Sequence, residues 1–436
     1  MLFRSAYKLG TEHEKFPFYV SDLSPVPYDG RPDRGVGGIR ALLDGMRDVT
    51  GWQEIEDGGL PIGLFDEAGG AISLEPGGQF ELSGAPVDNA HQTAAELDLH
   101  LAQVKEVAAR HDIGFLGLGM SPKWSFADTP RMPKSRYRIM TNYMPKVGSR
   151  GLDMMYRTCT VQVNLDFSSE ADMVRKLRVS IALQPLATAL FANSPFTEGR
   201  PNGRLSERSE IWRDTDNHRA GMLPFVFEDG MGFERYVDYA LQVPTYFVKR
   251  GATYHDVAGH DFRDLLAGRL AALPGARATM SDWANHLSTI FPEVRLKRYL
   301  EMRGADVGGR DHILALSAFF VGLLYDQGSL DACWDIVKGW SADERQRLRD
   351  DVPARALEAT IGGRDLRGLG KEVLAIARAG LARRRRLDAR GRDETVYLDV
   401  LEDRLARGRV AAQDWLDRFH GAWEGSVDPI FREAAF

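Results

Sequence analysis

The stretch that decides the fold is Thr160-Val161-Gln162-Val163-Asn164-Leu165-Asp166-Phe167. Polar and apolar side chains alternate along it, and side chains two residues apart lie on the same face of an extended strand. The apolar members would pack on a core, while the amide and carboxylate members would share the opposite face. The pattern therefore predicts a strand of an antiparallel sheet that has one polar face.

Three further segments place polar or charged side chains at the same spacing of two residues. They lie at residues 11–14, at residues 73–81 around a Pro-Gly-Gly break, and at residues 295–303. Their polar and charged members are Glu12, Glu14, Glu75, Gln79, Glu81, Arg295, Lys297, Glu301 and Arg303. A concave sheet face that gathers like charges is costly unless it holds metal ions and a polyanion. The four segments together thus indicate a binding site on one face of the sheet.

Composition excludes several classes of protein. The chain has 436 residues, of which 44% are hydrophobic and 27% charged, enough for a large packed core. The net charge of -6 argues against nonspecific nucleic-acid binding, which needs a basic surface. Cys159 and Cys333 are the two cysteines, too few for a disulfide framework or a zinc cluster. We expect a cytoplasmic protein without a signal peptide, membrane span or nucleic-acid partner.

The order of patterns along the chain predicts an α+β fold. Long helices are expected at residues 90–111 and 169–192, and a loop-rich stretch with five arginines at residues 193–221. Strands are expected at residues 7–20, ending at Pro17, and at residues 237–250 and 286–302, with helices from residue 314 onward. We expect a curved antiparallel sheet with helices packed outside it, in a single catalytic domain spanning residues 1–436. Its sheet core would cover about residues 7–310, and a mostly helical part residues 311–436.

The acids on the polar face suit divalent cations. Five of them are predicted to converge from separate strands: Glu12, Glu14, Glu75, Glu81 and Glu301. Mg²⁺ prefers oxygen ligands and bridges carboxylates to phosphate oxygens. Any one of these acids alone would fit a solvated acidic surface. The set favours a metal site, because it is interleaved with Gln79, Gln162 and Asn164, which are poor salt-bridge partners but useful ligand contacts.

Arginines on the same face suit phosphoryl transfer and carboxylate binding. Arg303 is two residues from Glu301, so a metal ligand and a guanidinium would point the same way, as a transferring phosphoryl group requires. Arg136 and Arg208 could each pair with a substrate carboxylate through two hydrogen bonds. Taken singly, an arginine of this kind is more often part of a surface ion pair.

Five motifs resemble the plant-type glutamate–cysteine ligases, a form that also occurs in proteobacteria. Two of them are Leu9-Gly10-Thr11-Glu12-His13-Glu14-Lys15-Phe16 and Arg157-Thr158-Cys159-Thr160-Val161-Gln162-Val163-Asn164. The others lie at residues 73–84, at residues 193–196 with Trp212, and at residues 291–306. The resemblance runs from about Gly10 to Pro429. It implies a fold like those of glutamine synthetase and the guanidino kinases, in which the concave sheet face is the active site.

The resemblance also implies an activity. Members join the γ-carboxylate of glutamate to the amine of cysteine through a γ-glutamyl phosphate, with ATP as co-substrate and about two or three Mg²⁺ ions. The products are ADP, phosphate and γ-glutamylcysteine, in the first step of glutathione biosynthesis. Carried over to this sequence, the metal ligands are Glu12, Glu14, Glu75, Glu81 and Glu301. Gln79, Gln162 and Asn164 face the nucleotide, Arg136 and Arg208 bind substrate, and Arg303 with Glu301 is catalytic.

Other interpretations remain open at this point. A related ligase could join glutamate to a different amine, with only the amine pocket changed. A nucleotide-binding protein that has lost turnover is a further alternative, disfavoured by the intact pair of Glu301 and Arg303. A glycosidase would use two carboxylates and gives no reason for the other three. The expected partners are small molecules alone, and the expected assembly is a monomer or homodimer.

Overall fold

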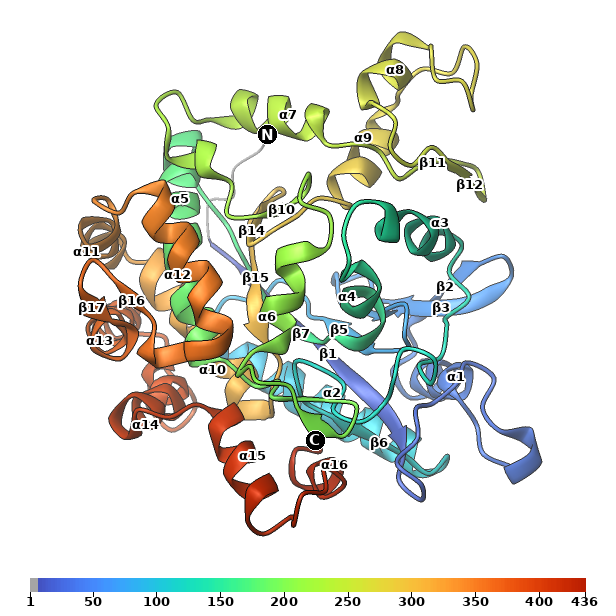
Figure 1. Ribbon diagram of the computed structural model, residues 1–436, viewed down its shortest axis with the longest axis horizontal. Coiled ribbons are helices and arrows are strands. Elements are labelled where there is room, and N and C mark those ends of the chain that lie inside the picture. Colours follow the sequence, from blue (N-terminus) through green and yellow to red (C-terminus); the bar gives the residue numbers. More distant parts are fainter. Residues whose placement is uncertain (1–6) are drawn as a thin grey trace.

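The computed structural model describes residues 7–436 and is built around one antiparallel sheet (Figure 1). In this part of the chain, nine strands pair to form the sheet, and every pairing in it is antiparallel. The strands are β1 (Leu9–Tyr19), β2 (Gln53–Asp57), β3 (Leu60–Phe65), β4 (Ala71–Leu74), β5 (Phe80–Ser83), β6 (Ile113–Leu116), β7 (Thr160–Leu165), β14 (Val294–Leu296) and β15 (Leu300–Asp306). Their order is β14-β15-β7-β1-β5-β4-β3-β2, with β6 paired to the end of β1. The predicted α+β class with an antiparallel sheet is confirmed.

Helices cover the apolar face of the sheet. Those that pack on its strands are α1 (Ile39–Thr50), α2 (Ala90–Ala109), α5 (Glu170–Leu190) and α10 (Arg310–Leu324). The central strand β7 shows the expected alternation, because Val161, Val163 and Leu165 are fully buried in the largest hydrophobic cluster. Ser169 caps α5 by accepting a hydrogen bond from the main-chain N–H of Asp172, as its position before the helix predicts.

The remaining helices lie over the polar face or in the C-terminal part. Near the polar face are α3 (Ser135–Tyr143), α4 (Gly151–Arg157) and α6 (Glu207–Ile211), followed by α7 (Phe233–Gln242), α8 (Phe262–Ala267) and α9 (Met280–Leu287). The C-terminal helices, orange to red in Figure 1, are α11 (Gln327–Val337), α12 (Ala342–Arg355), α13 (Leu366–Arg384), α14 (Asp399–Arg407), α15 (Ala411–His420) and α16 (Ile430–Glu433). Within residues 7–436 no single helix has the length and apolar character of a membrane span, and only the pair α10 and α11, bent by 90°, would pass together on length and composition.

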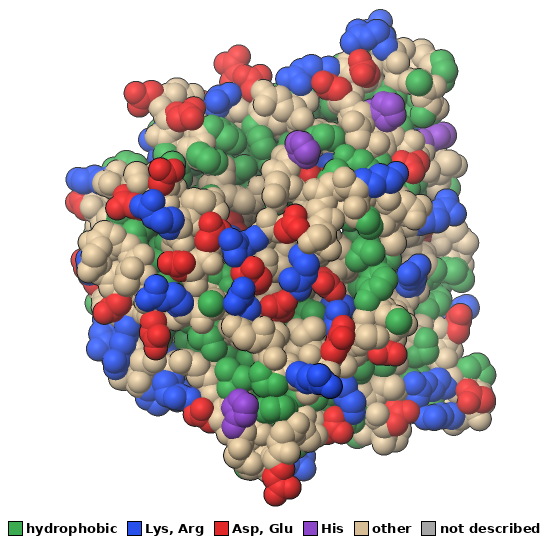
Figure 2. All heavy atoms as spheres, viewed as in Figure 1, with side chains coloured by type: hydrophobic (Ala, Val, Ile, Leu, Met, Phe, Trp, Pro, Cys, Tyr) green, Lys and Arg blue, Asp and Glu red, His purple; other side chains and the backbone are tan. Residues whose placement is uncertain are grey.

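Short two-stranded pairings complete the described chain. They are β8 (Phe196–Thr197) with β9 (Arg200–Pro201), β10 (Ala220–Gly221) with β13 (Phe291–Pro292), β11 (Phe247–Arg250) with β12 (Thr253–Asp256), and β16 (Thr360–Ile361) with β17 (Arg364–Asp365). On the surface, acidic and basic side chains are intermixed over the face seen in Figure 2.

Two predicted strands are in fact hairpins. Residues 73–81 are not one broken strand, because the main-chain N–H of Gly78 donates to the Glu75 carbonyl and closes a turn between β4 and β5. Gly78 has a φ of 89°, which glycine adopts without strain. Residues 295–303 likewise fold back on themselves, so that Arg295 lies directly opposite Glu301 in the pairing of β14 with β15.

Three other predictions about strands are wrong, wholly or in part. Pro17 does not end the first strand, because β1 changes partner there: residues 9–15 pair with β5 or β7, and residues 16–19 pair with β6. The predicted strand at residues 237–250 begins as the helix α7 and becomes a strand only at β11, while the one at residues 286–302 begins inside α9 and then forms β13, β14 and the start of β15. In both segments the apolar residues also fit one stripe of a helix, which short sequence windows do not distinguish from a strand.

Candidate active site

A cavity of about 400 Å³ lies over the polar face of the sheet. Its walls come from β1, β7, the turn between β4 and β5, the β14–β15 hairpin, and helices α3, α4 and α6. Four of the five predicted metal-binding acids line it: Glu12, Glu14, Glu75 and Glu81. The structure therefore brings these acids, which are up to 69 positions apart in the chain (Glu12 to Glu81), to one place.

The alternation of β1 aims two of these acids into the cavity. Glu12 and Glu14 line it, whereas Thr11 and His13 point to the helical layer, where Thr11 Oγ1 lies 2.7 Å from Ser317 Oγ of α10. β1 is paired on both sides over this stretch, with β5 and with β7. The backbone that carries the two acids is thus held by two ladders of hydrogen bonds.

Like charges crowd the floor of the cavity. Glu14 lies directly opposite Glu81 in the pairing of β1 with β5, an arrangement that is destabilising for two anions. Burial, with Glu301 and Glu81 nearby, raises the pKa of Glu12 to about 7. Burial and the neighbouring Glu75 and Glu81 also raise the pKa of Glu14. The protein alone does not supply enough positive charge to keep these carboxylates ionised together.

Neighbouring polar groups orient the acids. Asn164 Nδ2 donates to Glu12 Oε1 at 2.7 Å, and the main-chain N–H of Thr160 donates to Glu14 Oε2 at 2.8 Å. Glu81 accepts hydrogen bonds from the hydroxyls of Ser73 and Ser83, and Glu75 accepts one from Tyr137.

Glu301 lies in a different environment from the other four acids. It is fully buried and is not part of the cavity lining. Its carboxylate accepts hydrogen bonds from Arg295 Nε (2.7 Å), Lys297 Nζ (2.9 Å) and Arg303 Nη1 (2.6 Å). Although burial acts to raise it, the pKa of Glu301 is held well below its ordinary value by these three cations. In this structure Glu301 positions cations, and its role as a metal ligand stays a prediction.

The three cations on Glu301 form one end of the cavity. Arg295, Lys297 and Arg303 all line it, and Arg303 Nη1 also donates to Gln162 Oε1. The sequence placed Arg295 and Lys297 on the polar face but did not single them out as site residues. Their spacing of two residues was visible in the sequence. The hairpin adds what the sequence did not show, because it places Arg295 directly opposite Glu301.

The two predicted substrate arginines reach the cavity from helices. Arg136 lies on α3, and its guanidinium contacts the hydroxyl and ring of Tyr137. Arg208 lies on α6 and is 3% exposed, and its Nη2 donates to the main-chain oxygen of Arg303 at 2.9 Å. Both line the cavity, so the structure brings both predicted arginines to the acids.

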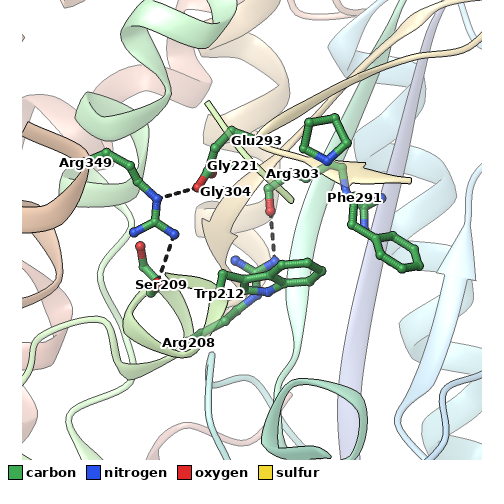
Figure 3. A pocket seen from close by; sticks show the side chains of 10 residues that line it. Arg208, Ser209, Trp212, Gly221, Phe291, Glu293, Arg303, Gly304 and Arg349 are labelled. Atoms are coloured by element: carbon green, nitrogen blue, oxygen red, sulfur yellow. Dashed lines mark hydrogen bonds and ion pairs between the residues drawn. The ribbon is translucent and has the colours of Figure 1, made fainter. Parts of the chain in front are cut away.

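A small recess beside Arg208 contains a buried arginine, Arg349, that fixes the position of helix α6 and so of Arg208 (Figure 3). Arg349 of α12 donates to Glu293 Oε1 and to the main-chain oxygen of Ser209, which ties α6 to the segment before β14. The side chains of Arg349 and Glu293 are 5% and 10% exposed. Sequence reasoning missed this buried ion pair, because nothing local in the helical C-terminal part distinguishes Arg349 from the surface arginines around it.

Gln79 also lines the cavity, but its side chain is bonded to the main chain. Its side-chain amide donates to the main-chain oxygens of Met155 and Thr158, and its Oε1 accepts a hydrogen bond from the N–H of Gly77. These bonds join the turn between β4 and β5 to the end of helix α4 and give Gln79 a structural role, and its contact with the nucleotide stays a prediction. Gln162 lines the cavity, while Asn164 lies just behind it against Glu12.

The donor set fits a divalent cation. The groups that converge are carboxylate oxygens, which Mg²⁺ prefers. Burial, together with repulsion from neighbouring acids, raises the pKa of Glu12 and of Glu14, and a cation would offset both effects. Asn164 Oδ1 is buried without a hydrogen-bond partner in the described structure, so a further oxygen is free beside Glu12. Within residues 7–436, no group of three or more His, Cys, Asp or Glu side chains is already gathered closely enough to hold an ion. The acids line one cavity without forming a preformed cluster.

Comparison with known proteins agrees with this architecture. A family model described as glutamate-cysteine ligase family 2 matches residues 8–433. The chloroplastic glutamate–cysteine ligase of Nicotiana tabacum is 54% identical over 433 residues, which cover 99% of this chain and 80% of the relative. The chloroplastic glutamate–cysteine ligase B of Oryza sativa is 53% identical over 430 residues, covering 99% and 84%.

A solved structure shares the fold at low sequence identity. The glutamate–cysteine ligase of Francisella tularensis in complex with AMP matches with a TM-score of 0.55 and 13% identity, over 99% of this chain and 88% of that one. At this identity the likeness concerns the fold alone.

The names of the relatives contradict the expected cytoplasmic location, since both of these relatives are chloroplastic. The expectation was too narrow because two unpaired cysteines, both of them buried here, require only that the compartment be reducing.

The family of the chain follows from the match over residues 8–433 and from identities above 50% that cover 99% of the chain. This chain belongs to the glutamate–cysteine ligase family 2.

Proposed function

We propose that the chain is an ATP-dependent ligase that joins the γ-carboxylate of L-glutamate to the amine of L-cysteine. The products are γ-glutamylcysteine, ADP and phosphate, as in the first step of glutathione biosynthesis. The observation that carries the proposal is a single cavity with an acidic floor and a cationic end, in a chain of this family. The substrates are free small molecules, and we propose a monomer or homodimer as the working form.

The cationic end of the cavity suits the triphosphate of ATP. Arg295, Lys297 and Arg303 come from one hairpin and are held in place by the carboxylate of Glu301. Held cations stabilise phosphate charge without reorganising during the reaction. Mg²⁺, bound by Glu12, Glu14, Glu75 and Glu81 with Glu301 as a further expected ligand, would neutralise phosphate charge.

Two bond exchanges make up the reaction. A γ-carboxylate oxygen of glutamate forms a bond to the γ-phosphorus of ATP, and the bond from that phosphorus to ADP breaks. The amine nitrogen of cysteine then forms a bond to the activated carbonyl carbon, phosphate leaves, and the amine loses a proton. Arg303 donates two hydrogen bonds to the phosphoryl group during its transfer, and Arg136 and Arg208 bind substrate carboxylates. Catalysis then results from positioning and charge stabilisation.

An assay with several amines tests the proposal. The protein is incubated with ATP, MgCl₂ and L-glutamate together with L-cysteine or one of several other amines, and ADP release and γ-glutamyl products are measured. We expect cysteine to give the highest kcat/KM. Equal rates with other amines would replace cysteine by a different acceptor, and nucleotide binding without turnover under all conditions would overturn the enzymatic proposal.

A further inference from the structure

One wall of the cavity is apolar, in contrast to its acidic floor. It is formed by Met140 of α3 and by Met154 and Met155 of α4, with Phe247 of β11 and Phe291 beside them. All five side chains belong to one hydrophobic cluster. We call Met140, Met154 and Met155 the methionine wall. An apolar surface makes no favourable contacts with a triphosphate or with divalent cations. We therefore assign it to an apolar part of a substrate.

The methionine wall and the cations line the same cavity but are attached to different strands of the sheet. Gln79 and Tyr137 tie α4 and α3 to the turn between β4 and β5, through hydrogen bonds to Met155 O (3.2 Å), to Leu74 O (2.9 Å) and to Glu75. The cations lie on β14 and β15, which the strands β7, β1 and β5 separate from β4. A triphosphate at the cationic side would therefore leave the methionine wall free for the amino acid substrates.

An arginine next to the wall completes a site for a small amino acid. Arg136 precedes Met140 by four residues on α3 (Ser135–Tyr143), so both side chains lie on the same face of the helix. Its planar guanidinium matches a carboxylate, and the thioether one turn away offers a polarisable apolar surface. The protons of the nearby hydroxyls are already donated, since Thr158 donates to the carbonyl of Met154 at 2.7 Å, Thr289 to that of His286 at 2.8 Å, and Tyr137 to that of Leu74 at 2.9 Å.

We propose that the methionine wall is the pocket for the side chain of the amine substrate and selects a thiol over a hydroxyl. This inference rests on the proposed function. A thiol is a weak hydrogen-bond donor and loses little when it leaves water for thioethers and aromatic rings. The hydroxyl of serine would lose its hydrogen bonds to water without replacement, and it is therefore discriminated against.

Three amines of similar size test the wall: L-cysteine, L-serine and L-2-aminobutyrate, whose ethyl side chain has no polar atom. We expect the wild type to use cysteine and aminobutyrate with kcat/KM at least about tenfold above that for serine. Met140→Gln and Met154→Gln place amides of similar size in the wall. Each should lower the ratio of kcat/KM for cysteine over serine by about tenfold, because an amide can satisfy the serine hydroxyl.

Conservative and remote changes serve as controls. Met140→Leu and Met154→Leu keep the wall apolar and should keep the selectivity. Met280→Gln makes the same chemical change at a side chain that is 79% exposed, and it should alter no ratio. The KM for ATP should stay within about twofold of the wild type in every variant.

Several outcomes would overturn the inference. Unchanged selectivity in both Gln variants would do so. A raised KM for ATP with unchanged selectivity would also do so, because it would indicate that the methionine wall contacts the adenine base. Rejection of aminobutyrate by the wild type would show recognition of the thiol by a polar contact, and this measurement needs no variant to fold. Absence of any γ-glutamyl product from the wild type would instead overturn the proposed function itself.

Discussion

Removing divalent cations should make the stability of this protein fall as the pH rises, because the pKa values of the buried acids Glu12 and Glu14 are raised, and the contribution of Glu12 can be sized. The pKa of Glu12 is raised from 4.5 to about 7 in the folded protein. The folded state therefore holds a proton more tightly than the unfolded state. The resulting stabilisation is fully present below about pH 4.5 and is lost as the pH rises through 7.

The size of the effect follows from the difference between the two pKa values. Each unit of pKa shift is worth ~1.4 kcal/mol, so Glu12 accounts for about 3 kcal/mol of unfolding free energy over the whole titration, from well below pH 4.5 to well above pH 7. This would be a large part of the stability of an ordinary domain, which is about 5–15 kcal/mol. A bound cation would keep Glu12 ionised in the folded state and remove the loss.

Urea unfolding at pH 5 and pH 8, with chelator or with MgCl₂, measures the effect. Between these pH values the metal-free wild type should lose about 2.5 kcal/mol more than Glu12→Gln. Glu67→Gln, an exposed acid in the turn between β3 and β4, should behave like the wild type. The same pH dependence in wild type and Glu12→Gln would refute the reasoning about crowded acids. A loss that MgCl₂ leaves unchanged would refute the cation site.

Three further predictions concern individual side chains. Arg303→Lys should lower kcat by about 100-fold and change the Kd of nucleotide by less than about threefold, because a point charge cannot replace the guanidinium fork at the phosphoryl group; rapid-quench kinetics with an unchanged kcat would remove Arg303 from the mechanism. Glu75→Gln should raise the Mg²⁺ concentration for half-maximal rate by about tenfold, and an unchanged Mg²⁺ titration would speak against Glu75 as a ligand. Arg349→Met should lower the free energy of unfolding by about 3 kcal/mol, since it strands Glu293 without its buried partner. For this last variant, a urea midpoint equal to that of the wild type would mean that the pair contributes nothing.

The local part of the site was predictable from sequence. The alternation in residues 11–14 and 160–166 depends on the period of a strand alone, so Glu12, Glu14 and Gln162 were placed on the correct face. The Pro-Gly-Gly segment was misassigned as a break in one strand, yet Glu75 and Glu81 still line the cavity. They do so because β4 and β5 are neighbours and Ser73 lies directly opposite Glu81.

The parts that depend on distant packing were not predictable. Arg349 reaches the site only because α12 packs against α6, and no local pattern marks that contact. The methionine wall likewise exists because α3 and α4 meet over the turn between β4 and β5. The structural role of Gln79 was missed because its partners are main-chain oxygens of Met155 and Thr158, 76 and 79 residues away. A polar residue in a motif can thus serve the scaffold that the motif builds.

Because β1 pairs on both sides, the position of Glu12 and Glu14 in the cavity depends on the register of this strand. Neighbouring residues of β1 face opposite sides, so one inserted or deleted residue ahead of Glu12 would turn both acids into the helical layer. The same slip would carry Thr11 and His13 into the cavity, replacing carboxylates by a hydroxyl and an imidazole. Variation in this strand can therefore proceed by substitution but not by a change of length, and loops elsewhere must absorb any insertions.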